Sequence, residues 1–147
     1  MPDGKKQIGD KQITTANAGP SPHATRANGF HLLADLRIAD HACLLDDTRL
    51  HQAFKAALQA GGFTIMHDHI QTFPGANSGS TGVFILAESH ASWHSYPEAD
   101  YLALDIFSCG EKDPSPVLEQ LANSLPITGQ SVRIAPRGPV QDDGKPV

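Results

Sequence analysis

Strand-length apolar segments alternate with two helical segments between residues 29 and 137, and this order constrains the fold more than any other feature. The predicted strands are residues 29–38, 63–73, 81–87, 101–107 and 131–135. The order strand, helix, three strands, helix, strand provides two helices that can cover one face of a mostly antiparallel sheet. Because 147 residues suffice for one domain but not for two ordinary ones, the sequence predicts a single two-layer α+β sandwich.

Both predicted helices have clear boundaries. The first follows the N-cap oxygens of residues 46–48 and ends at Gly61-Gly62, with four apolar side chains at helical spacing, Leu50, Phe54, Ala57 and Leu58. The second follows Asp113-Pro114 and stops before Pro126, with an apolar stripe of Val117, Leu118, Leu121 and Leu125. In the strand 101–107, plain alternation predicts one face that carries Leu102, Leu104 and Ile106.

The two ends of the chain have the composition of tails. Residues 1–28 and 138–147 are rich in polar and turn-forming residues, and residues 1–28 have no apolar period, so they bury too little surface to offset the entropy lost on ordering. We therefore expect a disordered N-terminal tail at 1–28, a domain at 29–137 and a flexible C-terminal tail at 138–147.

Composition argues against several classes of function. A net charge of -5 without clustered Lys and Arg argues against nucleic-acid binding. No apolar run approaches the roughly 20 residues of a membrane helix, and the N-terminus lacks the apolar segment of a secretory signal, so we expect a cytoplasmic protein without membrane contact. Cys43 and Cys109 do not make a disulfide framework, and a reducing compartment leaves Cys109 free to do chemistry.

Residues 87–98, Ala-Glu-Ser-His-Ala-Ser-Trp-His-Ser-Tyr-Pro-Glu, contain the densest set of reactive side chains. They follow the apolar run 82–87, and such an abrupt change is typical of a functional site at the edge of a sheet. Ser89, after a strand and beside imidazoles, suggests an activated hydroxyl. The nucleophile-elbow pattern Gly-x-Ser-x-Gly is missing around Ser89, however, which makes a hydrolase a weak hypothesis.

Two pairs of histidines could instead belong to a metal site. His90 and His94 have H-x-x-x-H spacing, and His67 and His69 lie on one face of the predicted strand 63–73. No third ligand accompanies His90 and His94, and histidines at positions such as 67 and 69 more often lie on a solvated face of a sheet. We therefore predict no metal and assign no role to His67 and His69.

One set of spaced motifs resembles the S-adenosylmethionine decarboxylase proenzymes of the short prokaryotic class: Glu-Ser-His at 88–90, His94, Pro-Glu at 97–98 and Cys-Gly at 109–110. The resemblance covers roughly residues 29–133 and implies the same fold. It also implies that the Ser89 hydroxyl attacks the preceding carbonyl, that elimination breaks the resulting ester at Glu88-Ser89, and that Ser89 becomes a pyruvoyl group. The mature protein would then consist of residues 1–88 and 89–147.

The resemblance implies a role for several side chains. In self-processing, His94 matches the family's proton acceptor, and Thr81 stands where a helper serine is usual. In the mature enzyme, the pyruvoyl carbonyl derived from Ser89 forms a Schiff base with the substrate amine and accepts the electrons released with CO₂, as PLP does elsewhere. Cys109 matches the family's proton donor, although without the motif it could equally be a small buried residue after a strand.

Three residues match the family's substrate-binding positions. Glu98 matches the ligand of the ribose hydroxyls and Phe73 the aromatic that stacks on adenine; Tyr96 stands where Trp is usual, and Trp93 where an aliphatic is common. The first hypothesis is a decarboxylase of polyamine biosynthesis that acts on S-adenosylmethionine, for which the resemblance implies a homodimer with sites built from both protomers. One alternative is the same fold and cofactor acting on ornithine or arginine, whose cationic end Glu98 and Asp100 could bind. The other is an unprocessed, non-catalytic homologue.

Overall fold

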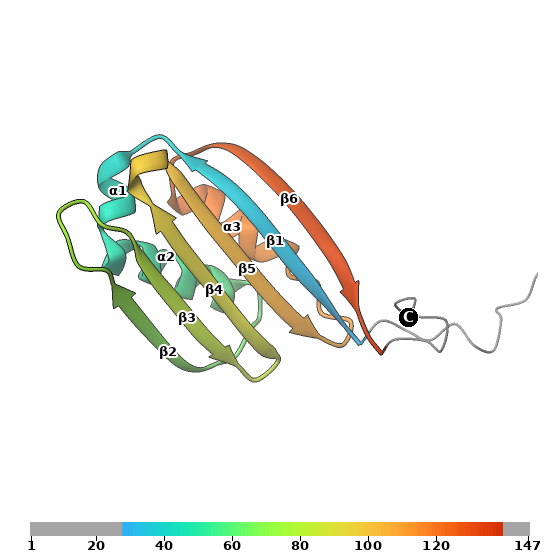
Figure 1. The fold of residues 1–147 in the computed structure, drawn as a ribbon. Coiled ribbons are helices and arrows are strands. Elements are labelled where there is room, and N and C mark those ends of the chain that lie inside the picture. The colour runs from blue at the N-terminus through green and yellow to red at the C-terminus, as the bar shows by residue number, and fades with distance from the viewer. Residues whose placement is uncertain (1–27, 140–147) are drawn as a thin grey trace, which may run out of the picture.

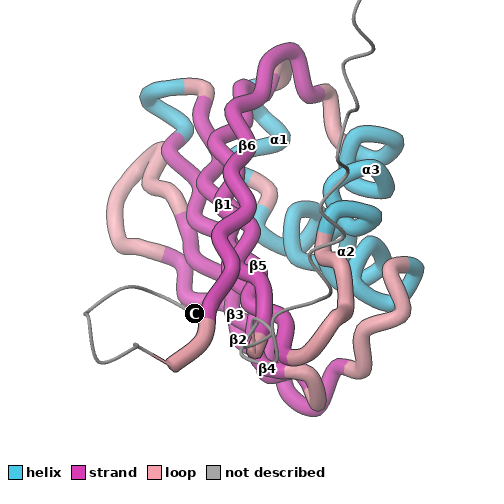
Figure 2. The backbone as a smooth tube through the Cα atoms, turned by 90° about the vertical axis from the view of Figure 1, so that its right-hand side faces the viewer, coloured by secondary structure: helices cyan, strands magenta, loops and turns pink. Residues whose placement is uncertain are grey.

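The computed structural model describes residues 28–139, which form one six-stranded sheet with the two longer helices on one face (Figure 1). Figure 2 shows these helices, α2 and α3, together on one side of the sheet. In chain order the elements are β1 (Gly29–Ile38), α1 (His41–Leu45), α2 (Asp47–Ala60), β2 (Ile65–Thr72), β3 (Ser80–Leu86), β4 (Ser89–Tyr96), the 3₁₀ helix η1 (Pro97–Ala99), β5 (Tyr101–Cys109), α3 (Ser115–Ser124) and β6 (Ile127–Arg137). The predicted two-layer α+β sandwich is confirmed.

The strand order is β2-β3-β4-β5-β1-β6, and every neighbouring pair is antiparallel. The sequence prediction missed β4, and most of the residues expected at the edge of the sheet lie in this central strand. Residues 89–96 form a strand in the middle of the sheet, with Ala91, Trp93 and Ser95 buried. Because only one of these three side chains is large and apolar, the alternation that marks a strand is weak in the sequence.

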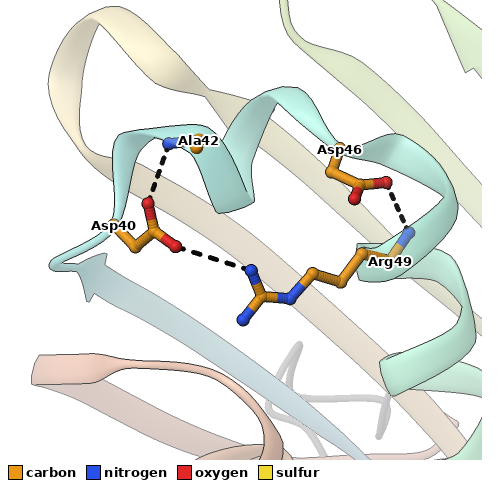
Figure 3. Close-up of polar contacts among 4 residues, drawn as sticks. All are labelled: Asp40, Ala42, Asp46 and Arg49. Atoms are coloured by element: carbon orange, nitrogen blue, oxygen red, sulfur yellow. Dashed lines mark hydrogen bonds and ion pairs between the residues drawn. The ribbon is translucent and has the colours of Figure 1, made fainter.

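Capping side chains define the helix boundaries (Figure 3). Asp46 accepts a hydrogen bond from the Arg49 N–H at 2.9 Å and caps α2, as predicted. Asp40 caps the short α1, which the sequence did not predict, by accepting from the Ala42 N–H at 3.0 Å. The Arg49 guanidinium also lies 3.5 Å from an Asp40 oxygen, so the first turn of α2 is tied to the start of α1.

The core lies between the sheet and the helices. The alternation predicted for β5 is confirmed, because three of its side chains are buried together, Leu102, Leu104 and Ile106. Phe54 of α2 meets Phe84 of β3 edge-on at 5.2 Å. His51 of α2, which is 6% exposed, stacks on Phe84 at 4.4 Å, and its Nε2 lies 2.7 Å from Asp68 of β2. These contacts fix α2 against β2 and β3.

The other face of the sheet carries a mixed surface of histidines and apolar side chains. Val83 and Ile85 of β3 are exposed there, at 39% and 51%. His69 and His67 of β2 are the cross-strand partners of Val83 and Ile85, so these two histidines share one face, as predicted. Among residues 28–139 no helix of the length of α2 or α3 covers this face (Figure 2).

Three of the expectations concern features outside or absent from the described part of the chain. The predicted tails, residues 1–28 and 138–147, lie outside it except for Asn28, Gly138 and Pro139. None of the helices within 28–139 is long and apolar enough to span a membrane. The same residues bring together no group of three or more His, Cys, Asp or Glu side chains that could hold a metal ion.

Candidate active site

A tight turn between β3 and β4 carries the Glu88-Ser89 pair. Leu86 pairs with Ser89 across it, so Ala87 and Glu88 are the two turn residues. Ser89 has a φ of 149°, in a region that residues with side chains rarely adopt. Two-residue hairpins favour Asn, Asp or Gly because their turns need positive φ, and neither turn residue here is one of these. Backbone strain is therefore found at the serine of the predicted cleavage site.

Two neighbouring segments hold this turn by backbone hydrogen bonds. The Cys109 N–H donates to the Glu88 carbonyl oxygen at 2.9 Å, and the Ala87 N–H donates to the Thr64 carbonyl at 2.9 Å. Gly110 follows Cys109 with a φ of 71°, a conformation that glycine adopts freely, so the chain can turn away directly after Cys109. An N–H donor on the Glu88 oxygen stabilises the negative charge that would develop there if the carbonyl carbon were attacked.

The Glu88 side chain is fixed as firmly as its carbonyl. Its Oε2 accepts from the Thr64 N–H at 3.1 Å and its Oε1 from the Lys112 ammonium at 3.1 Å. Lys112 also donates to the Gly62 carbonyl and lies 4.6 Å from the centre of the Phe63 ring. Burial raises the pKa of Glu88, but the hydrogen bonds from Thr64 and Lys112 outweigh it and lower that pKa overall. The side chain is therefore an anchored carboxylate.

Ser89 has a polar neighbour to which the sequence assigned no role. Its Oγ lies 3.3 Å from Nδ1 of His90, the next residue. The thiol of Cys109 is exposed and follows Ser108, the residue that pairs with Ser89 across β4 and β5. The sequence motif Glu-Ser-His names His90 but gives no sign that its imidazole approaches the Ser89 hydroxyl.

Thr81 and His94 meet at the other end of β3 and β4. They are cross-strand partners, and Thr81 Oγ1 lies 2.5 Å from His94 Nδ1. The His94 ring is also in contact with two aromatic rings, Tyr96 at 4.4 Å and Phe73 at 5.4 Å between centroids. The structure thus brings together four of the predicted site residues: a hydroxyl, an imidazole and two aromatic rings.

A cleft of about 410 Å³ opens beside this cluster, a volume within the usual range for small-molecule sites. Its walls are formed by Phe73, Asn77, Ser78, Gly79, His94, Ser95, Tyr96 and Glu98. The Tyr96 ring stacks on Tyr101 with centroids 5.1 Å apart and planes at 20°. The Tyr101 hydroxyl donates a hydrogen bond to Asp35 Oδ1 at 2.5 Å, and this bond raises the pKa of Tyr101 to about 12. Tyr96 is therefore backed by a neutral, anchored ring.

A second hollow, of about 470 Å³, borders Tyr101 and contains only Asp100 of the residues that the sequence analysis proposed as substrate ligands. It lies among β1, β5 and β6 and includes Asp35, Asp100 and Tyr101. The smaller cleft is the better candidate for the substrate, because it combines aromatic faces with the Glu98 carboxylate and the His94 imidazole.

A single copy of the chain keeps the two groups of residues apart. Ser89 and His94 stand near opposite ends of β4, and five residues at about 3.3 Å each separate them by about 16 Å. In Figure 1 the turn between β3 and β4 and the loop between β2 and β3 lie at opposite ends of these strands. Glu88 and Cys109 lie with Ser89, whereas Thr81 lies with His94. The residues of the motif therefore form two half-sites.

Trp93 belongs to neither half-site. It is 2% exposed, and its indole lies beside the buried His51 ring with centroids 6.2 Å apart. The side chains of the cleft include its neighbours His94 and Ser95 but not Trp93. Trp93 is therefore part of the core and not of the lining of this cleft.

Fold and site together define a small antiparallel α+β protein with reactive residues at both ends of a central strand. Residues 30–138 match the family model described as S-adenosylmethionine decarboxylase. The S-adenosylmethionine decarboxylase proenzyme of Thermoplasma volcanium is 34% identical over 112 residues, which cover 75% of this chain and 84% of that protein. Proenzyme 2 of Halalkalibacterium halodurans is 34% identical over 116 residues, 77% of this chain and 90% of its own. The chain belongs to the S-adenosylmethionine decarboxylase family.

A solved structure supports the same assignment. The crystal structure of the adenosylmethionine decarboxylase from Aquifex aeolicus superposes with a TM-score of 0.66 at 29% sequence identity. The match covers 80% of this chain and 96% of that one, so the six-stranded sheet and its helices are those of the family.

Proposed function

We propose that this chain is a proenzyme that cleaves itself between Glu88 and Ser89, and that the mature, pyruvoyl-dependent enzyme decarboxylates S-adenosylmethionine for polyamine synthesis. The observation that carries this proposal is the strained turn at Ser89, where the Glu88 carbonyl oxygen already receives the Cys109 N–H, in a chain of this family. The proteins that the chain resembles are named for S-adenosylmethionine, which favours that substrate over ornithine or arginine.

Self-cleavage needs no reactant other than water. In the first step Ser89 Oγ bonds to the Glu88 carbonyl carbon, the C–N bond breaks, and the amide becomes an ester with a free amine on Ser89. In the second step a base removes the Ser89 Cα proton and the bond between Cβ and Oγ breaks, which releases Glu88 as a new C-terminal carboxylate. Water then replaces the Ser89 nitrogen, which leaves as ammonia, and a pyruvoyl group remains.

The conformation of Ser89 suits this conversion. Its φ of 149° is a torsion about the bond from its nitrogen to Cα, and that nitrogen leaves during the reaction. Strain of this kind is typically about 1–3 kcal/mol and is absent from the product. The anchored Glu88 carboxylate holds the other side of the cleaved bond in place while it breaks.

In the mature enzyme the residues at the two ends of β4 have different tasks. A pyruvoyl group at position 89 supplies a carbonyl that accepts the electrons released with CO₂. Cys109, exposed at the end of β5, returns a proton to the substrate carbon. In the cleft, Phe73 and Tyr96 offer aromatic faces to the adenine, and the Glu98 carboxylate accepts hydrogen bonds from the ribose hydroxyls.

Because one copy holds two half-sites, the proposal requires a homodimer. About 16 Å separates Ser89 from His94 along β4, too far for His94 to remove the Ser89 Cα proton. A two-fold axis resolves this, because Ser89 and Cys109 of each copy can meet Thr81 and His94 of the other. The mixed face of the sheet, with exposed Val83 and Ile85, is a suitable surface for such a dimer.

We also propose a cytoplasmic location. Both cysteines are unpaired thiols, Cys43 buried and Cys109 exposed, as expected in a reducing compartment. A proton-donating thiol at position 109 also requires that Cys109 stays reduced.

The mass of the purified protein tests cleavage, and labelled substrates test the reaction. Wild type should yield fragments 1–88 and 89–147, the smaller with a blocked N-terminus, whereas Ser89→Ala should remain one chain. Processed protein should release CO₂ from carboxyl-labelled S-adenosylmethionine and not from ornithine or arginine, and Glu98→Gln should raise KM. An uncleaved wild type would contradict the whole proposal. Release from an amino acid alone would contradict the substrate.

Co-expression of two inactive variants tests the shared site. Ser89→Ala chains lack the serine but carry His94. His94→Ala chains carry Ser89 but lack the histidine. In mixed dimers one of the two sites is complete, so the His94→Ala chain should be cleaved, while the Ser89→Ala chain stays intact. Cleavage that remains as slow as in His94→Ala alone would mean that each copy uses its own His94.

A further inference from the structure

The first step of self-processing needs a base close to the Ser89 hydroxyl, and the residue at that place is not the one that the motif designates. His90 Nδ1 lies 3.3 Å from Ser89 Oγ, close to the range in which a general base works. We propose that His90 is the catalytic base of the first step, which accepts the Ser89 hydroxyl proton as Oγ attacks the Glu88 carbonyl carbon. This inference rests on the proposed self-cleavage at the same site.

The unusual backbone of Ser89 goes together with this contact. In a regular strand, consecutive side chains point to opposite faces of the sheet, so a serine hydroxyl and the next imidazole stay apart. At Ser89 the φ of 149° departs from the regular strand conformation, and here Oγ and Nδ1 come within hydrogen-bonding distance. The strained turn thus stores backbone strain and also coincides with the contact between the Ser89 hydroxyl and the His90 imidazole.

Neighbouring side chains hold the His90 ring. It packs edge-on against Phe107 of β5, with centroids 5.6 Å apart and planes at 63°. Phe107 is itself fixed, because the Arg137 guanidinium lies 5.3 Å from its ring and His31 lies 5.8 Å away. His31 in turn contacts Arg137 at 3.1 Å and Asp105 at 3.3 Å. The His90 imidazole is therefore supported by Phe107 of the neighbouring strand.

Two other polar groups beside the Ser89 hydroxyl are already engaged. The Glu88 carboxylate is ionised but bound to Thr64 and Lys112, and the Cys109 N–H is a donor directed at the carbonyl oxygen. His94 of the same copy is about 16 Å away. His90 therefore has the right chemistry and the contact with the reacting atom.

The proton moves in a closed cycle. Neutral His90 takes the Oγ proton at Nδ1 while the C–O bond forms and negative charge develops on the Glu88 oxygen, where the Cys109 N–H stabilises it. His90 then gives this proton to the Ser89 nitrogen as the C–N bond breaks. The imidazole returns to its neutral form, the amide has become an ester, and removal of the Cα proton is left to His94.

The first test compares three single variants. His90→Asn retains a hydrogen-bond acceptor without a base, His90→Ala removes both, and His41→Ala is the matched control, an exposed histidine on α1. General base catalysis typically contributes about 10²–10⁴-fold, so both His90 variants should process at least about 100-fold more slowly than wild type. His41→Ala should process normally. Circular dichroism and the fluorescence of Trp93 confirm that each variant is folded.

The second test traps the ester with hydroxylamine, which at neutral pH cleaves esters and leaves ordinary amides intact. His94→Ala should accumulate ester and be cut by hydroxylamine at Glu88-Ser89. In the double variant, with both His90→Asn and His94→Ala, the Glu88-Ser89 bond should remain an amide that hydroxylamine does not cut. The inference is overturned if the double variant is cut as fast as His94→Ala, if His90→Asn itself accumulates ester, or if His90→Asn processes at the wild-type rate. A wild type that never cleaves would instead contradict the proposed function.

Discussion

Gly82 of β3 leaves room for the indole of Trp93, and this packing makes a sharp prediction. A Cβ atom at position 82 would lie 2.0 Å from Trp93 Nε1 and 2.3 Å from Cε2. Carbon contacts are favourable near 3.5–4.0 Å, so the indole would have to move by more than 1 Å. Trp93 is 2% exposed and has little room to do so. Gly82→Ala should therefore destabilise the domain by about 1–3 kcal/mol, the usual effect of overpacking a core.

Urea unfolding of the uncleaved Ser89→Ala form measures this effect without interference from processing. For a domain of this size the same change lowers Tm by about 4 °C per kcal/mol. Gly129→Ala is the matched control, because its Cβ would meet only the Arg37 Cβ at 3.7 Å, an ordinary contact. We expect Gly129→Ala to lie within about 0.5 kcal/mol of the parent.

A double-mutant cycle identifies the clash itself. Trp93→Leu removes the indole atoms that the new methyl group would strike, at the expense of a cavity. In that background Gly82→Ala should change the free energy of unfolding by less than about 0.5 kcal/mol, a coupling of about 1–3 kcal/mol between the two sites. The reasoning is refuted if Gly82→Ala is as stable as Gly129→Ala, or if its effect is the same with Leu at position 93.

Three further variants test other contacts. Cys109→Ala should process normally but turn over slowly and accumulate smaller chains with an N-terminal alanine, as seen by mass spectrometry, because the proton goes to the cofactor carbon; normal turnover without alanine would make the thiol structural. Tyr101→Ala should raise KM about 2- to 12-fold with kcat little changed, because Tyr96 loses its stacked ring, and Tyr101→Phe should not. Hydrogen bonds, from His51 foremost, lower the pKa of Asp68, so its stabilising effect is present above the ordinary Asp pKa of about 3.9 and is lost as pH falls through the lower folded value. Asp68→Asn should therefore be less stable than wild type at pH 7, and the difference in urea midpoint should shrink below about pH 4; a constant difference would contradict the linkage.

The two longer helices could be predicted because their ends depend on local chemistry. Asp46 caps α2 through the nearby Arg49 N–H, and Gly61 ends that helix, within short stretches of sequence. By contrast, β4 has a core face of Ala91, Trp93 and Ser95, and Ser95 is buried because its hydroxyl accepts from the Ser80 N–H at 2.9 Å on the neighbouring strand. That partner comes from tertiary structure, so the periodicity of residues 89–96 alone did not show a strand.

Side-chain contacts between distant segments were equally invisible. Lys112 reaches Glu88 and the Gly62 carbonyl only because the turn after β5 comes back beside the β3–β4 turn. Sequence spacing could suggest that Cys109 belongs near Ser89, through the resemblance to a family, but it gave no reason to single out a lysine three residues further on.

The five-residue spacing from Ser89 to His94 shows how a compact motif can be misleading. In a loop such a spacing would allow the two side chains to meet, whereas in a strand it places them about 16 Å apart. The same strand must then serve two sites, one through each end. If His90 starts the rearrangement within one copy and His94 of the second copy completes it, ester formation and elimination depend on different conditions: the first requires only a folded chain, the second also requires the dimer. Assembly would thereby control the irreversible step, because only elimination breaks the chain.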